Sequence, residues 1–190
     1  MPGDLKEELF RIAGASDRSQ VAYRLRYKNF FMGRWIKHCG IYPVWVLRFY
    51  KPNKVRWERL VNPTAVVDGE EGRLQGHFHH YSFRKGLSAW VDKHNSYSTQ
   101  EALESLRSLS EGGVSWGDLL NWREPAKRRV AMKELSFRLP CRSHLRFLYM
   151  YFFKLGFLDG IPGYHYCKLL SIYEYLITLK MREFRDSNQR

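Results

Sequence analysis

Cysteine is scarce in this chain of 190 residues, and no stretch approaches the roughly 20 apolar residues that span a bilayer. The three cysteines, Cys39, Cys141 and Cys167, are scattered and form neither a disulfide framework nor a metal-ligand pair. That spacing favours a reducing compartment. The first ten residues are acidic and amphipathic, without the basic-then-apolar layout of a signal peptide. We therefore expect a cytoplasmic protein that is neither secreted nor membrane-spanning.

The common catalytic motifs are also missing. The sequence contains no Gly-x-Gly-x-x-Gly, no phosphate-binding loop, no Gly-x-Ser-x-Gly and no Asp-x-Asp. His77 and His79 share one face of a predicted strand and His80 the other, but no third metal ligand stands nearby in the sequence. His38 and Cys39 are adjacent and therefore point in different directions. These residues predict neither a metal site nor a nucleophilic cysteine.

Positive charge and aromatic rings are what the chain has in excess. It carries 32 Lys and Arg against 19 Asp and Glu, a net charge of +13, and 16% of its residues are aromatic. The pI is about 9.8. Such a chain attracts anionic partners: a nucleic acid, an acidic lipid or a phosphorylated small molecule.

The charge is concentrated in one region. Residues 123–146 include eight basic and two acidic side chains, and the aromatic-rich stretch 147–153 follows directly. Such a pair of segments fits an anionic membrane surface, with aromatics at headgroup depth. It also fits nucleic acid, the least favoured partner, with rings stacking on bases. The third alternative is a solvated basic helix face beside a buried helix.

Periodicity predicts strands first and helices afterwards, which is an α+β pattern. Residues 20–31 alternate as a strand that carries Arg24, Arg26 and Lys28 on one face. The other predicted elements are a helix over 2–13, strands over 42–49 and 55–61, and a hairpin of 66–67 with 74–83. Helices are predicted over 87–109, with a second one starting at the Ser98 capping box, over 125–140, and on both sides of 162–163.

Cations and indoles alternate in the first half of the chain. Arg34 and Lys37 flank Trp35, and Arg48 follows Trp45. Rings stack on pyranose faces, and Arg forks grip phosphate, so this combination suits a phosphorylated or sugar-bearing ligand. The alternative is strand-surface charge with buried aliphatic stems.

Six stretches in this order resemble the C-terminal half of bacterial family 2 glycosyltransferases, of the kind that build lipopolysaccharide core and other surface polysaccharides. They are NFFMGRWIKH (29–38), PVWVLRFY (43–50), VRWERLVN (55–62), GRLQGHFHHYSF (72–83), WVDKHNSYS (90–98) and GFLDGIPG (156–163). The resemblance covers roughly residues 4–183.

The resemblance implies a GT-A fold and an inverting transfer from a nucleotide sugar to an acceptor hydroxyl. A complete enzyme of this kind uses a base on the acceptor and a divalent metal, Mg or Mn, bound by an Asp-x-Asp motif. That motif belongs to the donor-binding half, which precedes the segment that this chain resembles. We therefore expect the chain itself to hold no metal and to be a fragment with little transfer activity, or one that works with a separate donor-binding half.

Site residues are carried over by matching positions. The resemblance implies substrate-binding roles for Arg34, Trp35, Arg48, Asn62, His80, Lys93 and Tyr97. Relatives commonly show Val-His-Glu where this chain has Val61-Asn62-Pro63, so that carboxylate is missing. Glu58 and Asp68 are the nearby carboxylates that could serve as base.

Two parts are predicted from all this. Residues 1–83 form the acceptor-side part of an incomplete GT-A-like sheet, and residues 84–190 form a helical C-terminal extension. The partners implied are a nucleotide sugar and a glycan or lipid-linked acceptor, with the extension lying on the inner face of the membrane. The rival hypothesis is a non-catalytic basic module that binds anionic lipid or RNA.

Overall fold

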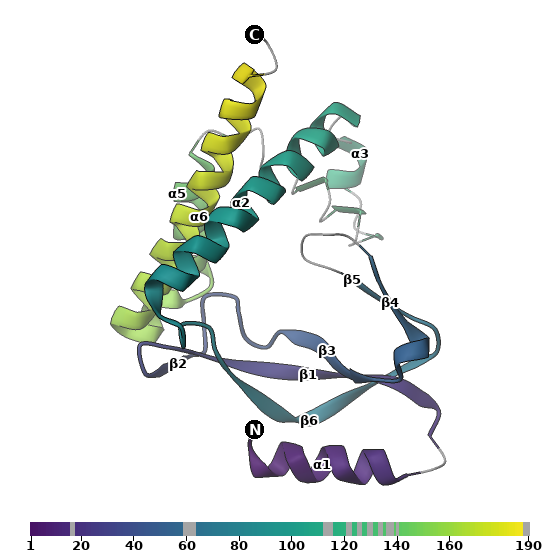
Figure 1. Ribbon diagram of the computed structural model, residues 1–190. Coiled ribbons are helices and arrows are strands. Elements are labelled where there is room, and N and C mark those ends of the chain that lie inside the picture. Colours follow the sequence, from purple (N-terminus) through teal and green to yellow (C-terminus); the bar gives the residue numbers. More distant parts are fainter. Residues whose placement is uncertain are drawn as a thin grey trace. The chain divides into compact units, whose positions relative to one another are not determined.

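A computed structural model of the chain places the strands in its first 81 residues and a helical region after them (Figure 1). The prediction of a mixed α and β protein with this order is confirmed. The structure describes residues 1–15, 18–58, 64–111, 116–120, 123–124, 127–128, 131–132, 135, 139 and 141–187. The chain divides into two units: residues 1–87 with 150–166, and residues 88–149 with 167–190.

The sheet of the first unit is built around β1 (Gln20–Phe31), whose bounds match the predicted strand. Along one edge β1 pairs antiparallel with β3 (Trp45–Tyr50) and then with β2 (Arg34–Ile36). Along its other edge it pairs in parallel with β6 (Glu70–Tyr81). The sheet is therefore mixed. Within the described residues β6 pairs only with β1, so its far edge carries no neighbouring strand.

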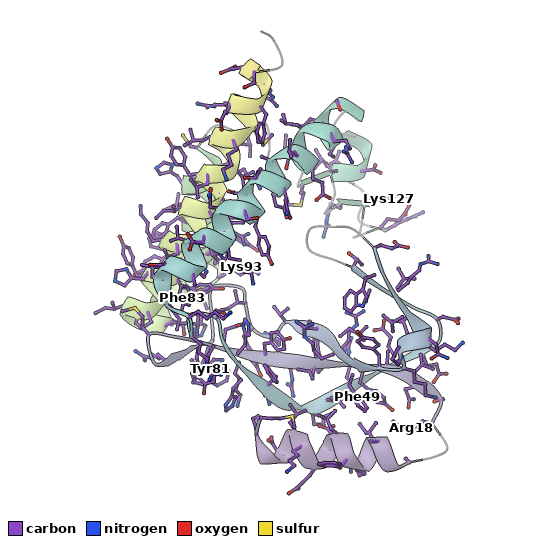
Figure 2. The ribbon with its side chains drawn as sticks, viewed as in Figure 1. Arg18, Phe49, Tyr81, Phe83, Lys93 and Lys127 are labelled. Atoms are coloured by element: carbon purple, nitrogen blue, oxygen red, sulfur yellow. The ribbon has the colours of Figure 1, made fainter. Side chains whose placement is uncertain are left out.

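One face of this sheet is closed by α1 (Gly3–Gly14), which lies along it (Figure 1). Tyr23 and Leu25 alternate toward the helix and form a buried cluster with Leu5 and Leu74. The side chain of Phe49 lies between the sheet and α1, where it packs against this cluster (Figure 2). Burial of such apolar side chains is the main source of stability here.

A carboxylate fixes the position of the helix on the sheet. The two oxygens of Glu8 accept the backbone N–H groups of Gln75 and Gly76, each at 2.9 Å. The pairing of β1 with β6 is irregular nearby, between Arg24 and Arg26. Glu8 therefore satisfies donors of β6 in a stretch where the ladder is interrupted.

The hairpin predicted around residues 68–72 is wrong. A 3-10 turn, η1 (Pro52–Lys54), leads into β4 (Val55–Glu58). β5 (Thr64–Val67) pairs antiparallel with β4 as a separate two-stranded sheet. The turn itself is present, with Gly69 at φ 139°, but the chain leaves it to pair with β1 instead. The reason is burial: Leu74 is fully buried in the cluster under α1.

The second unit contains α2 (Gly86–Glu111), which is one continuous helix, so the predicted second start at Ser98 is wrong. The Ser98 hydroxyl donates to the carbonyl of Asn95 within the helix instead of capping a new one. A short helix, α3 (Trp116–Leu119), follows. Most of the predicted basic helix over 125–140, including both of its prolines, lies outside the described residues.

The C-terminal region runs through α5 (Arg142–Leu148), a π-helical turn η2 (Tyr149–Phe153), a 3-10 turn η3 (Gly156–Asp159) and α6 (Gly160–Ser187). The predicted break at 162–163 is wrong, because Pro162 stands in the first turn of α6, where its missing N–H costs nothing.

Helices α2 and α6 run side by side (Figure 1). Their contact buries Ala102, Ile177 and Met181. An ion pair between Arg142 and Glu174, 2.6 Å apart and mostly buried, lies in the same unit. In the described part of the chain, no helix is both long and apolar enough to cross a membrane.

The packing of α1 on the sheet can be tested at Gly76. A methyl group there would lie 2.9 Å from Cα of Leu5, which is backbone and cannot turn aside. Gly76→Ala should therefore destabilise the first unit by about 1–3 kcal/mol, measured by urea unfolding and by faster hydrogen exchange of the α1 amides. Gly14→Ala is the matched control, because a methyl group there meets nothing within 4 Å. Equal stability of the two variants would contradict this packing.

Candidate functional site

The face of the sheet opposite α1 carries cations and aromatic rings. Because side chains alternate along a strand, Arg26 and Lys28 of β1 point away from the cluster that contains Tyr23 and Leu25. The cross-strand partners of Arg26 are Trp45 on β3 and His77 on β6. We call this surface the cationic–aromatic face and define it by Arg26, Lys28, Trp35, Lys37, Tyr42, Trp45, Arg73 and His77.

Trp45 makes cation–π contacts with two guanidinium groups. The Cζ atoms of Arg26 and Arg73 are 5.0 and 5.2 Å from the ring centroid of the indole. At such distances each cation–π contact contributes about 0.5–1 kcal/mol at an exposed site. Nη2 of Arg26 donates to the carbonyl of Gln75 at 2.7 Å. Its Nε is buried and has no hydrogen-bond partner in the described part of the chain.

Trp35 repeats this arrangement with two lysines. The Nζ atoms of Lys28 and Lys37 are 4.8 and 5.0 Å from its ring centroid. The ring of Tyr42 meets the indole edge-on, with centroids 5.2 Å apart. A tight turn places Trp35 opposite Phe30 of β1, with Met32 and Gly33 both at positive φ, as a two-residue hairpin requires. The indole Nε1 is buried and, among the described residues, has no hydrogen-bond partner.

His77 joins the two halves of this face. Its Nε2 is hydrogen-bonded to the hydroxyl of Tyr42 at 2.8 Å, and the two rings stack. Burial lowers the pKa of His77 below its ordinary value of 6.5, and the positive charges of Arg26 and Lys28 lower it further. The imidazole is therefore neutral at pH 7 and adds no charge to the face.

The cations of this face are not held in ion pairs, although Glu71, whose pKa is lowered mainly by its hydrogen bond from Arg24, is also acted on by the charge of Arg73. Among the described residues, no ion pair is formed by Arg26, Lys28, Lys37 or Arg73. The nearest exception on β1 is Arg24, which pairs with Glu71. Four like charges held by two indoles repel one another, and an anionic ligand would relieve that repulsion. The geometry therefore suits phosphate groups, which guanidinium and ammonium groups bind through charge-assisted hydrogen bonds.

A buried carboxylate holds one end of the face in place. Asp159 is 3% exposed and accepts the backbone N–H groups of Lys37 and His38 at 3.1 and 2.8 Å. Its Oδ1 is also 2.9 Å from Nδ1 of His38. These bonds fix the loop from which Lys37 reaches Trp35. No local sequence pattern predicts this contact, because Asp159 stands 121 residues beyond His38.

Of the residues carried over from the resemblance that the structure describes, Trp35 alone lies on the cationic–aromatic face. Arg48 bonds the hydroxyl of Tyr27, whose ring stacks on His80 5.2 Å away, on the α1 side of the sheet. His80 also bonds Oδ1 of Asn29. Arg34 pairs with Phe31 and lies close to Gly160. The structure therefore brings Arg48 and His80 together, but on the other face from Trp35.

The remaining predicted residues lie elsewhere. Glu58 ends β4 and pairs with Arg56 at 3.0 Å. Asp68 follows β5 and is exposed, and a hydrogen bond from Lys54 lowers the pKa of its carboxyl. Both carboxylates are already engaged by cations. On α2 of the second unit, Nζ of Lys93 lies 5.2 Å from the ring centroid of Tyr97 (Figure 2).

Asn62 lies outside the described residues. Within those residues, no three His, Cys, Asp or Glu side chains converge in a way that could hold a metal ion.

Comparisons with known proteins found no matching family model, no matching curated protein and no matching solved structure.

The electrostatics of the face can be tested through His77. An NMR titration of its imidazole should give a midpoint below 6.5, and Lys28→Gln should move that midpoint upward by removing one of the lowering charges. Lys51→Gln is the control and should leave it unchanged. Because the unfolded chain takes up this proton at a higher pH than the folded chain, His77 should also make the protein less stable as pH falls below 6.5. A midpoint at or above 6.5 would contradict the geometry described here.

Proposed function

We propose that this chain is the acceptor-side part of a family 2-like glycosyltransferase, which transfers a sugar from a nucleotide sugar to a surface-polysaccharide or lipopolysaccharide acceptor. The observation that carries the proposal is the cationic–aromatic face, whose four cations form no ion pair in the described part of the chain. An acceptor that carries phosphate groups on its sugars would meet cations that bind phosphate through charge-assisted hydrogen bonds.

The placement of the family-like stretches supports the same proposal. Trp35 comes from residues 29–38, Trp45 from 43–50, Arg73 from 72–83 and Asp159 from 156–163. Four of the six stretches that resemble the family therefore contribute to one surface of the first unit or to the loop beside it. Residues far apart in sequence that meet on one surface favour a shared binding role over four unrelated structural ones.

The sequence predicts that the indoles of Trp35 and Trp45 stack on sugar rings, and the structure favours a different role for them. Each ring is in contact with two cations, so the rings are engaged by the protein's own side chains. We infer that the indoles position the cations and that the cations contact the ligand. This narrows the ligand to one that carries phosphate, and a neutral glycan becomes the weaker candidate.

We assign binding and orientation of the acceptor to this face and leave the proton transfer to a group elsewhere. His77 is neutral but bonded to Tyr42, and the two candidate carboxylates, Glu58 and Asp68, stand on or beside a different sheet. The complete reaction also needs a nucleotide sugar and a divalent ion. Within the described residues no three His, Cys, Asp or Glu side chains converge to hold such an ion, so its ligands would belong to the donor-binding half.

The proposal can be tested by binding of a phosphorylated oligosaccharide. Deacylated lipopolysaccharide core oligosaccharide should bind the chain, and the double substitution Lys37→Gln/Arg73→Gln should weaken that binding about a hundredfold or more, because each lost charge-assisted bond costs about 1.5–3 kcal/mol. Both side chains are exposed, so the variant should fold. Isothermal titration calorimetry measures the change.

Two controls sharpen the result. Arg11→Gln removes an exposed cation from α1, on the opposite side of the sheet, and should bind as the unaltered chain does. Oligosaccharide treated with phosphatase should bind weakly to every form of the protein. If single-stranded RNA binds more tightly than the oligosaccharide, with a steep dependence on salt, the rival basic-module function is correct and the glycosyltransferase proposal fails.

A further inference from the structure

His38 and Asp159 form a hydrogen-bonded pair beside the cationic–aromatic face, and we call it the His38–Asp159 dyad. Oδ1 of Asp159 lies 2.9 Å from Nδ1 of His38, and both residues belong to the first unit. A carboxylate can only accept a hydrogen bond, so Nδ1 carries the proton between them. The other ring nitrogen, Nε2, then holds a lone pair whenever the imidazole is neutral.

The two members of the dyad lie in different environments. Asp159 is 3% exposed, and Sγ of the buried Cys39 lies 3.8 Å from its Oδ2. The side chain of His38 is 32% exposed. In the part of the chain that the structure describes, its hydrogen bond is made through Nδ1. The dyad is therefore a solvent-accessible nitrogen base whose ring is oriented by a buried carboxylate, as a base in catalysis requires.

The order of the loop does not require the imidazole. Oδ1 of Asp159 already accepts the backbone N–H of Lys37 at 3.1 Å, and Oδ2 accepts that of His38 at 2.8 Å. Each oxygen of the buried carboxylate thus has a donor without the side chain of His38. The further bond to Nδ1 fixes the orientation and the tautomer of the ring, which a purely structural loop would not need.

Two exposed cations stand close to the dyad. Lys37, a member of the cationic–aromatic face, directly precedes His38 in the chain. A methyl group on Gly160, the residue that follows the carboxylate of the dyad, would lie 3.3 Å from Nη1 of Arg34. Neither cation forms an ion pair within the described residues. A phosphate group held here would bring the hydroxyls of the sugar that carries it within reach of His38.

We propose that His38 is the general base that takes the proton from the acceptor hydroxyl and that Asp159 positions it. The inference rests on the proposed function. As the O–H bond of the acceptor breaks, its proton moves to Nε2. The acceptor oxygen bonds to the anomeric carbon of the nucleotide sugar, and the bond from that carbon to the diphosphate breaks, its electron pair leaving with the nucleoside diphosphate. Asp159 stays ionised and stabilises the imidazolium that forms.

Contact between the acceptor and Nε2 can be tested by acylation with diethyl pyrocarbonate, followed by peptide mass spectrometry. Phosphorylated core oligosaccharide at about ten times its Kd should slow the modification of His38 about tenfold, because only the unoccupied chain reacts. The exposed His144 of α5, in the second unit, is the control, and its rate should not change. If calorimetry shows that the oligosaccharide binds while His38 reacts as fast as before, the dyad is not the base, although the proposed function stands. If the oligosaccharide does not bind, both proposals fail.

The positioning role of Asp159 can be read from the tautomer of His38. In a long-range ¹H–¹⁵N spectrum, neutral His38 should show a protonated Nδ1 and an unprotonated Nε2. Asp159→Asn should populate both tautomers, because an amide no longer selects the Nδ1–H form. A proton on Nε2 in the unaltered chain would overturn the proposal, since that nitrogen could not then accept one from the acceptor. The protection experiment on the unaltered chain decides the question if Asp159→Asn does not fold.

Discussion

Strand β1 has an apolar face and a charged face, and this alternation determines how the rest of the first unit packs around it. Tyr23 and Leu25 point to one side and require a hydrophobic cover, which α1 provides. Arg26 and Lys28 must then point to the other side, because the strand alternates. A helix on that second side would bury unpaired charge at high cost. The face can therefore remain open to an anionic ligand, and the indoles of the neighbouring strands hold its cations in place.

Asp159 connects this face to the C-terminal region. Its two oxygens bind the backbone of Lys37 and His38, so one buried carboxylate orders the loop that carries Lys37 and also the turn that exposes Phe153 and Ile161. In an apolar setting a carboxylate needs several donors, and here the loop supplies them. One buried side chain therefore holds together the loop beside the cationic–aromatic face and the turn Gly156–Asp159.

Features that depend on local periodicity, such as the bounds of a strand, could be predicted from the sequence. Features that depend on contacts between distant residues, such as strand pairing, could not. The alternation of residues 20–31 gave the bounds of β1 and the side of Arg26. The same alternation does not identify the strand with which each strand pairs. The local turn signal predicted a hairpin, whereas β6 pairs with β1 because Leu74 of β6 is buried there. Likewise, Trp35 and Arg48 both stand in stretches where cations and indoles alternate, and the sequence does not distinguish their positions. In the structure, their strands place the two side chains on opposite faces of the sheet. Asp159 had no signal, since nothing local distinguishes a carboxylate that binds a loop 121 residues away.

The central claim is that the cationic–aromatic face binds phosphorylated sugar, and the indole N–H signals of the chain report on it most directly. In a two-dimensional ¹H–¹⁵N correlation spectrum, titration with phosphorylated core oligosaccharide should shift the indole N–H signals of Trp35 and Trp45. These two rings contact the four cations of the face. The indole of Trp57, on the separate pair of β4 and β5, should stay in place. If all three signals shift alike, or if only that of Trp57 moves, the face assigned here is not the binding surface.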